Sequence, residues 1–372
     1  AAILGARADV VCLQEASGRS PFEQDFDFMF QDGYEGTLLD RGRMRCATFW
    51  RPERVALAGE PLSKDRTLIT PFQLREAASE APLVWVINAH LAAGPQPGRR
   101  LRQAHDALET VRKERGRMGV SDQRPAVVFC GDLNADDELE GATAVNQLLV
   151  NGSVKKGYVD PHHAELGPVS SRNRKQACGC FTDAYASVFS GGAAPATLIA
   201  PELINRFFVS DRTSITPALS SSLDAMFDRY SASSSLGEQV MDKAAVDRWL
   251  IDINRNSTRG SEYRAALAAF ERNGGAFLTR GDLARVYMEE LEAGKFWGVA
   301  YDLWATGSHA GCLPEPSRAG TELEVFEARF DRIYFTEPSL ELTAVRQPRK
   351  AGATGPLPSR HEPSDHLPIG VA

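Results

Sequence analysis

Residues Ala126-Val-Val-Phe-Cys-Gly-Asp-Leu-Asn134 join a short apolar run to a polar turn. The run is rich in β-branched and aromatic side chains and ends at a glycine, which predicts a buried strand. Three other apolar runs end in polar groups in the same way, at Gln14-Glu15, Asn88-Ala-His90 and Ser364-Asp-His366. In α/β sheets, strand ends are where side chains from distant parts of the sequence gather into one site. These segments therefore predict a polar site at one edge of a sheet.

The order of the predicted elements gives the fold class. Strands are predicted over Asp9–Glu15, Cys46–Trp50, Leu83–His90 and Ala126–Gly131, with a helix over Arg99–Arg117 between the last two. Strand, helix and strand in this order are typical of a layered α/β domain. Helical periodicity then dominates from residue 203 to residue 302, and a strand pattern returns at 330–335 and near 364–371. We therefore expect an α/β domain in two parts, residues 1–202 and 303–372, with an inserted all-α subdomain at 203–302.

Composition limits the function classes. The 372 residues are 43% hydrophobic and 24% charged, with a net charge of −7 and a pI near 5.6. This acidic balance argues against a strongly basic nucleic-acid-binding domain, although local basic segments occur at Arg99–Arg117 and Arg172–Lys175. The longest apolar runs are far shorter than the roughly 18 residues that cross a bilayer, so no membrane span is expected.

The six cysteines show neither the paired spacing of a zinc site nor the density of a secreted disulfide scaffold. This usage indicates a reducing compartment and hence an intracellular, cytoplasmic protein. Targeting to an organelle stays open, and the sequence indicates no particular partner protein.

The strand-end residues have structural explanations when each is taken alone. A strand-terminal carboxylate is often a cap or turn residue, and an embedded histidine is often a core residue. Together they supply the parts that phosphate ester hydrolysis requires. Carboxylates at Glu15, Asp132 and Asp365 suit Mg²⁺ or Mn²⁺, and the lack of a Cys/His cluster argues against zinc. His366 is a candidate base for the attacking water if Asp331 holds its other ring nitrogen.

Five segments carry a resemblance to a known family. They are Leu13-Gln-Glu15, Asn88-Ala-His-Leu91, Gly131-Asp-Leu-Asn134, Phe330-Asp-Arg-Ile-Tyr-Phe335 and Ser364-Asp-His-Leu-Pro368. Their order resembles that of the endonuclease/exonuclease/phosphatase superfamily, from the first residues to the last. The resemblance implies a four-layer α/β sandwich, in which two packed mixed sheets are flanked by helices. That family normally begins with a strand ending in an Asn of the metal site, and we expect this first strand to be missing before Ala1.

The resemblance also implies a role for each site residue. Glu15 and Asp365 would contact the metal, and Asp132 would activate or align the nucleophilic water or support a second metal. Asn134 would orient the scissile phosphate, and His90 would donate to a phosphate oxygen. His366 would act as general base or phosphate ligand, with Asp331 orienting it.

Three segments resemble the deadenylase and nocturnin branch of that superfamily: Arg45–Trp50, Asn88–Leu91 and Arg99–Gln103. The branch implies a phosphodiester in RNA or a nucleotide phosphate as substrate, cleaved by a 3'-exonuclease, with Arg102 as a phosphate contact. Members that act on inositol phosphates or lipids share the same core, so a phosphatase of such substrates stays an alternative.

The helical block resembles a degenerate pair of EF-hands, as found inserted in plant and algal members. Residues Glu271–Asp282 have the length of a Ca²⁺-binding loop, with Asn273 third and Leu278 eighth. The first residue is Glu271 instead of Asp, the sixth is Ala276 instead of Gly, and the last is Asp282 instead of Glu. We expect a structural pair that does not bind Ca²⁺. The competing hypothesis is a Ca²⁺-responsive binding module on an inactive hydrolase fold.

Overall fold

The computed structural model describes residues 2–16, 19–40, 45–76, 83–135, 142–189, 194–209, 214–233, 237–258, 260–275, 277–316, 322–348, 364 and 366–372. The chain divides into two compact units. The α/β unit comprises residues 1–198, 327–349 and 366–372, and the helical unit comprises residues 199–326. The predicted helical block at 203–302 lies inside the helical unit.

The larger sheet of the α/β unit has the strand order β11-β16-β8-β7-β6-β4, with β5 pairing onto β6. Its strands are β4 (Val55–Leu57), β5 (Leu62–Lys64), β6 (Thr67–Leu74), β7 (Val84–His90), β8 (Ala126–Asp132), β11 (Phe181–Asp183) and β16 (Asp331–Thr336). Strands β7 and β8 are parallel, because helix α4 (Pro97–Arg117) carries the chain back between them, and the other pairs are antiparallel. The larger sheet is therefore mixed.

The smaller sheet is antiparallel and has the order β1-β3-β2. Its strands are β1 (Val10–Ala16), β2 (Glu35–Leu38) and β3 (Arg45–Trp50). Trp50 from β3 shares a buried cluster with Val86 of β7 and Ile333 of β16. This cluster is the apolar layer between the two sheets.

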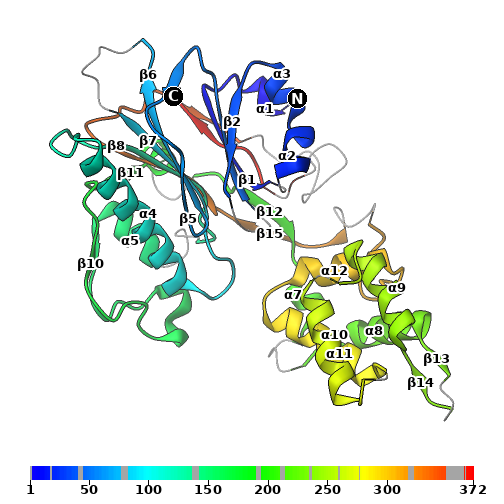
Figure 1. Cartoon of the computed structure of the whole chain (residues 1–372). Helices are drawn as coiled ribbons and strands as arrows, with labels where there is room; N and C mark the ends of the chain where they lie inside the picture. Colours follow the sequence, from blue (N-terminus) through cyan, green and yellow to red (C-terminus); the bar gives the residue numbers. More distant parts are fainter. Residues whose placement is uncertain are drawn as a thin grey trace. The chain divides into compact units, whose positions relative to one another are not determined.

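Helices cover the outer faces of both sheets. On the larger sheet, α4 and α5 (Ala144–Val150) pack Leu101, Leu108 and Leu148 against Ile87 and Phe129. On the smaller sheet, α1 (Ala2–Gly5), α2 (Arg19–Asp25) and α3 (Asp27–Gln31) lie over a cluster that includes Met29 and Phe49 (Figure 1). The order helix, sheet, sheet, helix confirms the predicted four-layer α/β fold.

Local sequence explains where these helices begin. Pro97 occupies the first turn of α4, where its missing N–H costs no hydrogen bond. Thr143 caps α5, because its side chain accepts a hydrogen bond from the Asn146 amide. The smaller elements of the unit are β9 (Ser153–Val154), η1 (Pro161–Leu166), β10 (Arg174–Lys175), α6 (Ala184–Val188), β17 (Val345–Arg346) and β18 (Gly370–Val371). The strand predicted near 364–371 is thus confirmed only at its end.

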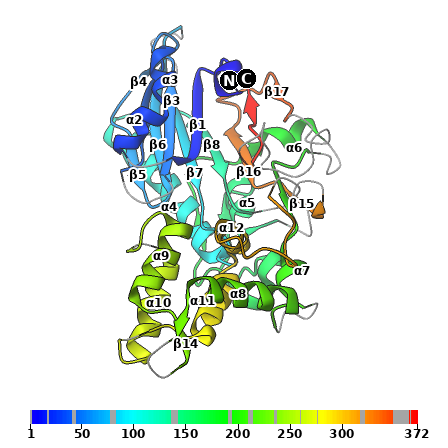
Figure 2. The same ribbon diagram turned by 90° about the vertical axis from the view of Figure 1, so that its right-hand side faces the viewer.

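The helical unit is built mainly of helices, among them α8, α9, α10 and α11 (Figure 2), and has a core of its own that includes Phe227, Trp249 and Tyr287. Its helices are α7 (Ile204–Phe207), α8 (Pro217–Tyr230), α9 (Lys243–Asn254), α10 (Ser261–Arg272), α11 (Arg280–Glu292) and α12 (Phe296–Ala305), and β13 (Ala232–Ser233) pairs with β14 (Gln239–Val240). An antiparallel bridge between Met241 and Leu278 joins the loop after α8 to the loop after α10. Strands β12 (Leu198–Pro201) and β15 (Val325–Ala328) form a two-stranded sheet. Among the described helices, none combines the length and apolarity that crossing a membrane would need.

Candidate active site

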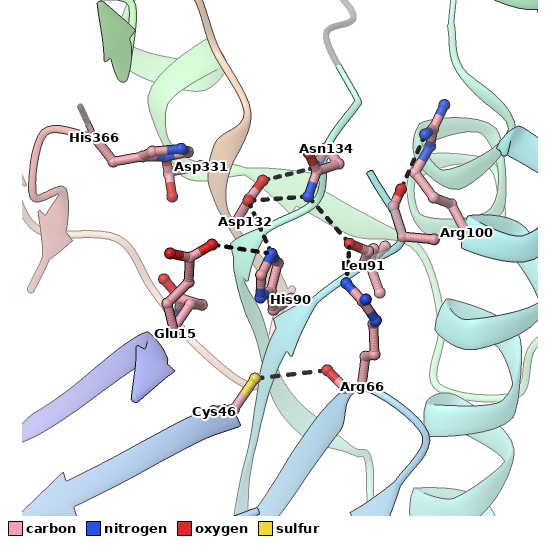
Figure 3. Close-up of polar contacts among 12 residues, drawn as sticks. Glu15, Cys46, Arg66, His90, Leu91, Arg100, Asp132, Asn134, Asp331 and His366 are labelled. Atoms are coloured by element: carbon pink, nitrogen blue, oxygen red, sulfur yellow. Dashed lines mark hydrogen bonds and ion pairs between the residues drawn. The ribbon is translucent and has the colours of Figure 1, made fainter. Parts of the chain in front are cut away.

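Three neighbouring strands of the larger sheet place polar side chains at one edge (Figure 3). His90 ends β7, Asp132 ends β8, and these two residues are paired across the parallel ladder. Asp331 begins β16 and pairs with Asp132 across the antiparallel ladder. Parallel strands bring their carboxyl ends to the same edge, and an antiparallel neighbour begins there. The topology thus brings together three residues that lie 42 and 199 positions apart in sequence.

Glu15 joins these residues from the smaller sheet. The β1–β3 register shifts between Leu13 and Ala16, and Glu15 has a positive φ of 59° at this bulge. A non-glycine residue in this conformation carries backbone strain, and bulges often redirect a side chain next to an active site. The exposed Glu15 carboxylate lies 3.9 Å from Nε2 of His90. We call Glu15, His90, Asp132, Asn134, Asp331 and His366 the strand-end cluster.

Asn134 and Asp132 hold each other in place. The Asn134 backbone amide donates to Asp132 Oδ1 at 2.8 Å, and its side-chain amide donates to Asp132 Oδ2 at 3.0 Å and to the Leu91 carbonyl at 3.1 Å. Gly131 makes this turn possible, because its φ is 122° and a Cβ there would lie 2.1 Å from the Ala89 carbonyl oxygen. Both Asp132 oxygens therefore have a fixed orientation.

His366 and Asp331 form a close pair. His366 Nδ1 lies 2.6 Å from Asp331 Oδ2, and the Asp331 side chain is largely buried. The Asp331 backbone amide donates to Thr197 Oγ1 at 2.9 Å, which fixes the start of β16. The pairing of these two residues is the contact expected from the sequence. Asp365, the second predicted metal ligand, lies outside the described residues.

Burial makes His90 a neutral group at pH 7. Its side chain is only 6% exposed, and Nε2 lies 3.5 Å from Asp132 Oδ2. Burial, followed by the positive charge of Arg66 and that of His366, lowers the pKa of His90 to about 4. Its Nδ1 atom is buried without a hydrogen-bond partner in the part of the chain that the structure describes. A neutral imidazole has one N–H to donate, which suits a hydrogen bond to an anionic oxygen.

The carboxylates of the cluster repel one another. Burial raises the pKa of Asp132 to about 7, the charge of Asp331 adds to this effect, and that of Glu15 contributes further. Carboxylate oxygens brought this close together fit a hard divalent cation, which prefers carboxylates. The described residues contain no complete group of three or more Asp, Glu, His or Cys ligands around one point. The fit therefore rests on Glu15 and Asp132, on either side of His90.

Asn88 was not among the predicted site residues, although it lies two residues before His90 on β7. Its side-chain amide donates to the carbonyls of Leu13 (3.2 Å) and Ala47 (2.9 Å), and its Oδ1 accepts from Gln14 at 2.9 Å. Asn88 thus connects β7 to β1 and β3, and so links His90 to the bulge that carries Glu15. A polar residue in the middle of an apolar strand is the sequence signal that identifies it.

Helix α4 supports the cluster with residues other than the predicted Arg102. Arg100 Nη1 donates to the Ala92 carbonyl at 3.0 Å and to the Gly94 carbonyl at 2.6 Å, while Gln103 Oε1 accepts from the Ala92 amide at 2.9 Å. These buried side chains fix the loop that follows His90. Arg102 is exposed, and no contact within the described residues joins it to the strand-end cluster.

Comparison with known proteins identifies the family. The family model described as Endonuclease/Exonuclease/phosphatase family matches residues 1–366. No curated protein sequence matches the chain significantly. Among solved structures, ANGEL2, a 2',3'-cyclic phosphatase, is 17% identical over 53% of this chain and 67% of its own, with a TM-score of 0.40. The human Nocturnin catalytic domain is 18% identical over 52% and 67%, with a TM-score of 0.36.

A truncated Caenorhabditis elegans TDP2 is 13% identical, with a TM-score of 0.41, and the match covers 99% of this chain and 85% of that one. At these TM-scores the structural matches do not indicate a substrate for this chain. The family model, in contrast, spans almost the whole chain and includes every described residue of the strand-end cluster. The chain therefore belongs to the endonuclease/exonuclease/phosphatase family and is a hydrolytic phosphoesterase.

Proposed function

We propose that the chain is a Mg²⁺- or Mn²⁺-dependent phosphodiesterase that acts as a nuclease, removing nucleotides from a 3' end as in the deadenylase branch. The observation that carries the proposal is the 2.6 Å contact between His366 Nδ1 and Asp331 Oδ2, next to the carboxylate of Asp132. A histidine held by a carboxylate is the arrangement that allows proton transfer to or from water at neutral pH.

In this proposal His366 accepts the proton of the attacking water, and Asp331 orients the imidazole and stabilises its charged form. The buried, neutral His90 donates a hydrogen bond to a non-bridging phosphate oxygen, where negative charge develops in the transition state. Asn134 holds Asp132 through two hydrogen bonds, so that its carboxylate faces the reaction without reorientation.

Glu15 and Asp132 are the residues that would hold the divalent cation, with Asp365 as a further proposed ligand. A bound cation would neutralise phosphate charge and make the attacking water more acidic. The strained backbone of Glu15 supports this assignment, because strain of this kind is retained where a side chain must point in one direction.

The test is hydrolysis of bis-p-nitrophenyl phosphate and of a short RNA with a 3' adenylate tail, each with Mg²⁺, Mn²⁺ or EDTA. Asp331→Asn and His366→Asn are the test variants, and His163→Asn is the matched control, because His163 is partly exposed outside the cluster and contacts Glu165. We expect metal-dependent turnover that falls by at least about 100-fold in the test variants and is unchanged in the control. No turnover of either substrate with either metal would refute the phosphodiesterase proposal.

Turnover of the small diester without turnover of RNA would refute the nuclease assignment alone. In that case nucleotides, inositol phosphates and phospholipid headgroups are the substrates to test next. Equal activity in wild type and both variants would show that the His366–Asp331 pair does not act in catalysis.

A further inference from the structure

Three arginines from two separate segments lie close enough for the charges of Arg102 and Arg172 to act on Arg174. Arg102 is on α4, and Arg172 and Arg174 belong to the segment that runs along this helix. Two contacts fix the alignment of the segments: a Cβ on Gly98 would lie 3.2 Å from the Val169 carbonyl oxygen, and Cys178 Sγ lies 3.9 Å from the Leu108 carbonyl oxygen. We call Arg102, Arg172 and Arg174 the arginine group.

The positive charges of this group are poorly compensated. Arg102 and Arg172 are exposed, and neither forms an ion pair with any residue that the structure describes. Arg174 is partly buried, and its Nε atom is buried without a hydrogen-bond partner among the described residues. Burial and then the charge of Arg172 lower the pKa of Arg174, with a smaller contribution from Arg102, while Asp106 is the acid that opposes them. Such a group favours an anionic ligand.

The stability of α4 does not explain a positive charge near its beginning. The amino end of a helix carries a partial positive charge, which favours acids over bases. Helix α4 has no acid in its first turn, and Arg99 and Arg100 occupy that turn just before Arg102. Arginines near the other end of α4 do have structural partners, since Arg117 pairs with Glu114 and Arg115 donates to the Val120 carbonyl.

The arginine group is connected to the candidate active site through the first turns of α4. The loop between His90 and α4 is held by Arg100 and Gln103, which contact Ala92 from the same helix (Figure 3 shows Arg100 and His90). Arg102 lies between Arg100 and Gln103 in sequence and projects to solvent. A chain that extends from the strand-end cluster over this loop therefore runs toward the first turns of α4, which carry Arg102.

We propose that Arg102, Arg172 and Arg174 bind backbone phosphates of a single-stranded nucleic acid, several nucleotides away from the phosphate that is cleaved. This inference rests on the proposed function and deepens it: the protein holds the substrate strand at phosphates beyond the one that is cleaved. Guanidinium groups suit the contact, because they stay charged and hydrogen-bond to two phosphate oxygens at once. Because the net charge of the whole chain is −7, the attraction for phosphates comes from the arginine group and not from the chain as a whole.

The test is binding, which does not depend on catalysis. A fluorescently labelled oligonucleotide of about 12 nucleotides is titrated with the full chain in EDTA, and anisotropy gives Kd over a range of salt concentrations. The test variant combines Arg102→Gln with Arg172→Gln. The control variant combines Arg112→Gln with Lys113→Gln. It removes the same number of positive charges, two, but from another exposed part of α4.

We expect the test variant to bind about tenfold more weakly and its salt dependence to fall by roughly 1.4 in the slope of log K against log salt, since each phosphate contact on a single strand contributes about 0.7. The control should match wild type. For a dinucleotide, Kd should be the same in all three proteins, because such a ligand is too short to reach the arginine group.

Equal oligonucleotide affinity and equal salt slope in wild type and test variant would overturn the inference, as would equal losses in the two variants. Failure of the proposed function is recognised separately, as a lack of turnover of both substrates or of the RNA alone. The binding result decides the role of the arginine group in either case.

Discussion

The Asn88 side chain connects the two sheets of the α/β unit, so its removal tests how much this connection stabilises the unit. It is fully buried, and its amide nitrogen has two hydrogens but three acceptors within reach, namely the carbonyls of Leu13 and Ala47 and the Thr48 hydroxyl. With the bond accepted from Gln14, about three hydrogen bonds are satisfied at once. Each contributes about 1 kcal/mol net. We therefore expect Asn88→Ala to lower the free energy of unfolding by about 3 kcal/mol, or roughly 6–12 °C in Tm.

Hydrogen exchange measured by mass spectrometry locates this loss of stability along the chain. Peptides from β1, β3 and β7 should lose protection in Asn88→Ala, while peptides from α9 in the helical unit should exchange as in wild type. Gln14→Ala should cost about 1 kcal/mol, and the double variant should show a coupling of about 1 kcal/mol between the two positions. A loss below 1 kcal/mol for Asn88→Ala, or a coupling of zero, would refute the assignment of Asn88 as the connection between the sheets.

Three further predictions concern other parts of the chain. Burial, with the charge of Glu262 next in effect, raises the pKa of Asp302 to about 8, so the unfolded chain loses this proton near pH 4 while the folded chain keeps it. The urea midpoint of wild type should therefore fall between pH 5 and pH 8 by more than that of Asp302→Asn. Equal falls in the two proteins would disprove this. Ca²⁺ should leave Tm unchanged, because Asp282, the last residue of the EF-hand-like loop, already accepts hydrogen bonds from Asn273 (2.8 Å), Thr279 (2.6 Å) and Arg272 (3.3 Å). A Tm that rises with Ca²⁺ and not with Mg²⁺ would contradict this. Gly131→Ala should lower the free energy of unfolding by at least about 3 kcal/mol in chemical denaturation, because the positive φ and the nearby Ala89 carbonyl both disfavour a Cβ. A loss under 1 kcal/mol would show that the backbone can adjust.

The Ca²⁺ prediction follows from how the loop between α10 and α11 is closed. Asp282 and Thr279 form a capping box at the start of α11, and the Arg272 guanidinium contributes a positive charge to the same carboxylate. These contacts lower the pKa of Asp282 to about 2, although burial acts in the opposite direction. A carboxylate with these partners has little left to offer a cation. We propose on this basis that the EF-hand-like pair has a structural role.

Much of the fold was predictable because its signals are local. The strands expected over 83–90 and 126–131 and the helix expected over 99–117 follow from apolar periodicity, and the structure has them at 84–90, 126–132 and 97–117. The return of strand pattern at residue 331 after a long helical block indicated that one sheet is built from distant segments. The antiparallel character of the smaller sheet and the shortness of β18 depend on pairing partners, which no local pattern reveals.

The candidate site divides in the same way. Motifs selected Glu15, His90, Asp132, Asn134, Asp331 and His366, because acids, amides and histidines at strand ends are chemically conspicuous. The role of Asn88 needed the two sheets to be stacked, since its acceptors lie on β1 and β3. The inward orientation of Arg100 and Gln103, next to an outward Arg102, needed the rotation of α4 about its own axis.

The sequence by itself determined the fold class, the order of the elements and the types of side chain available for chemistry, since these depend on periodicity and on residue identity. Only the tertiary structure decided which groups meet and what their charges become. His90 is neutral because burial and Arg66 lower its pKa. Asp132 holds its proton more tightly because it is buried and because Asp331 is its neighbour across the sheet. Desolvation and Coulomb interactions act through space, so they are fixed only when strands far apart in the chain come together.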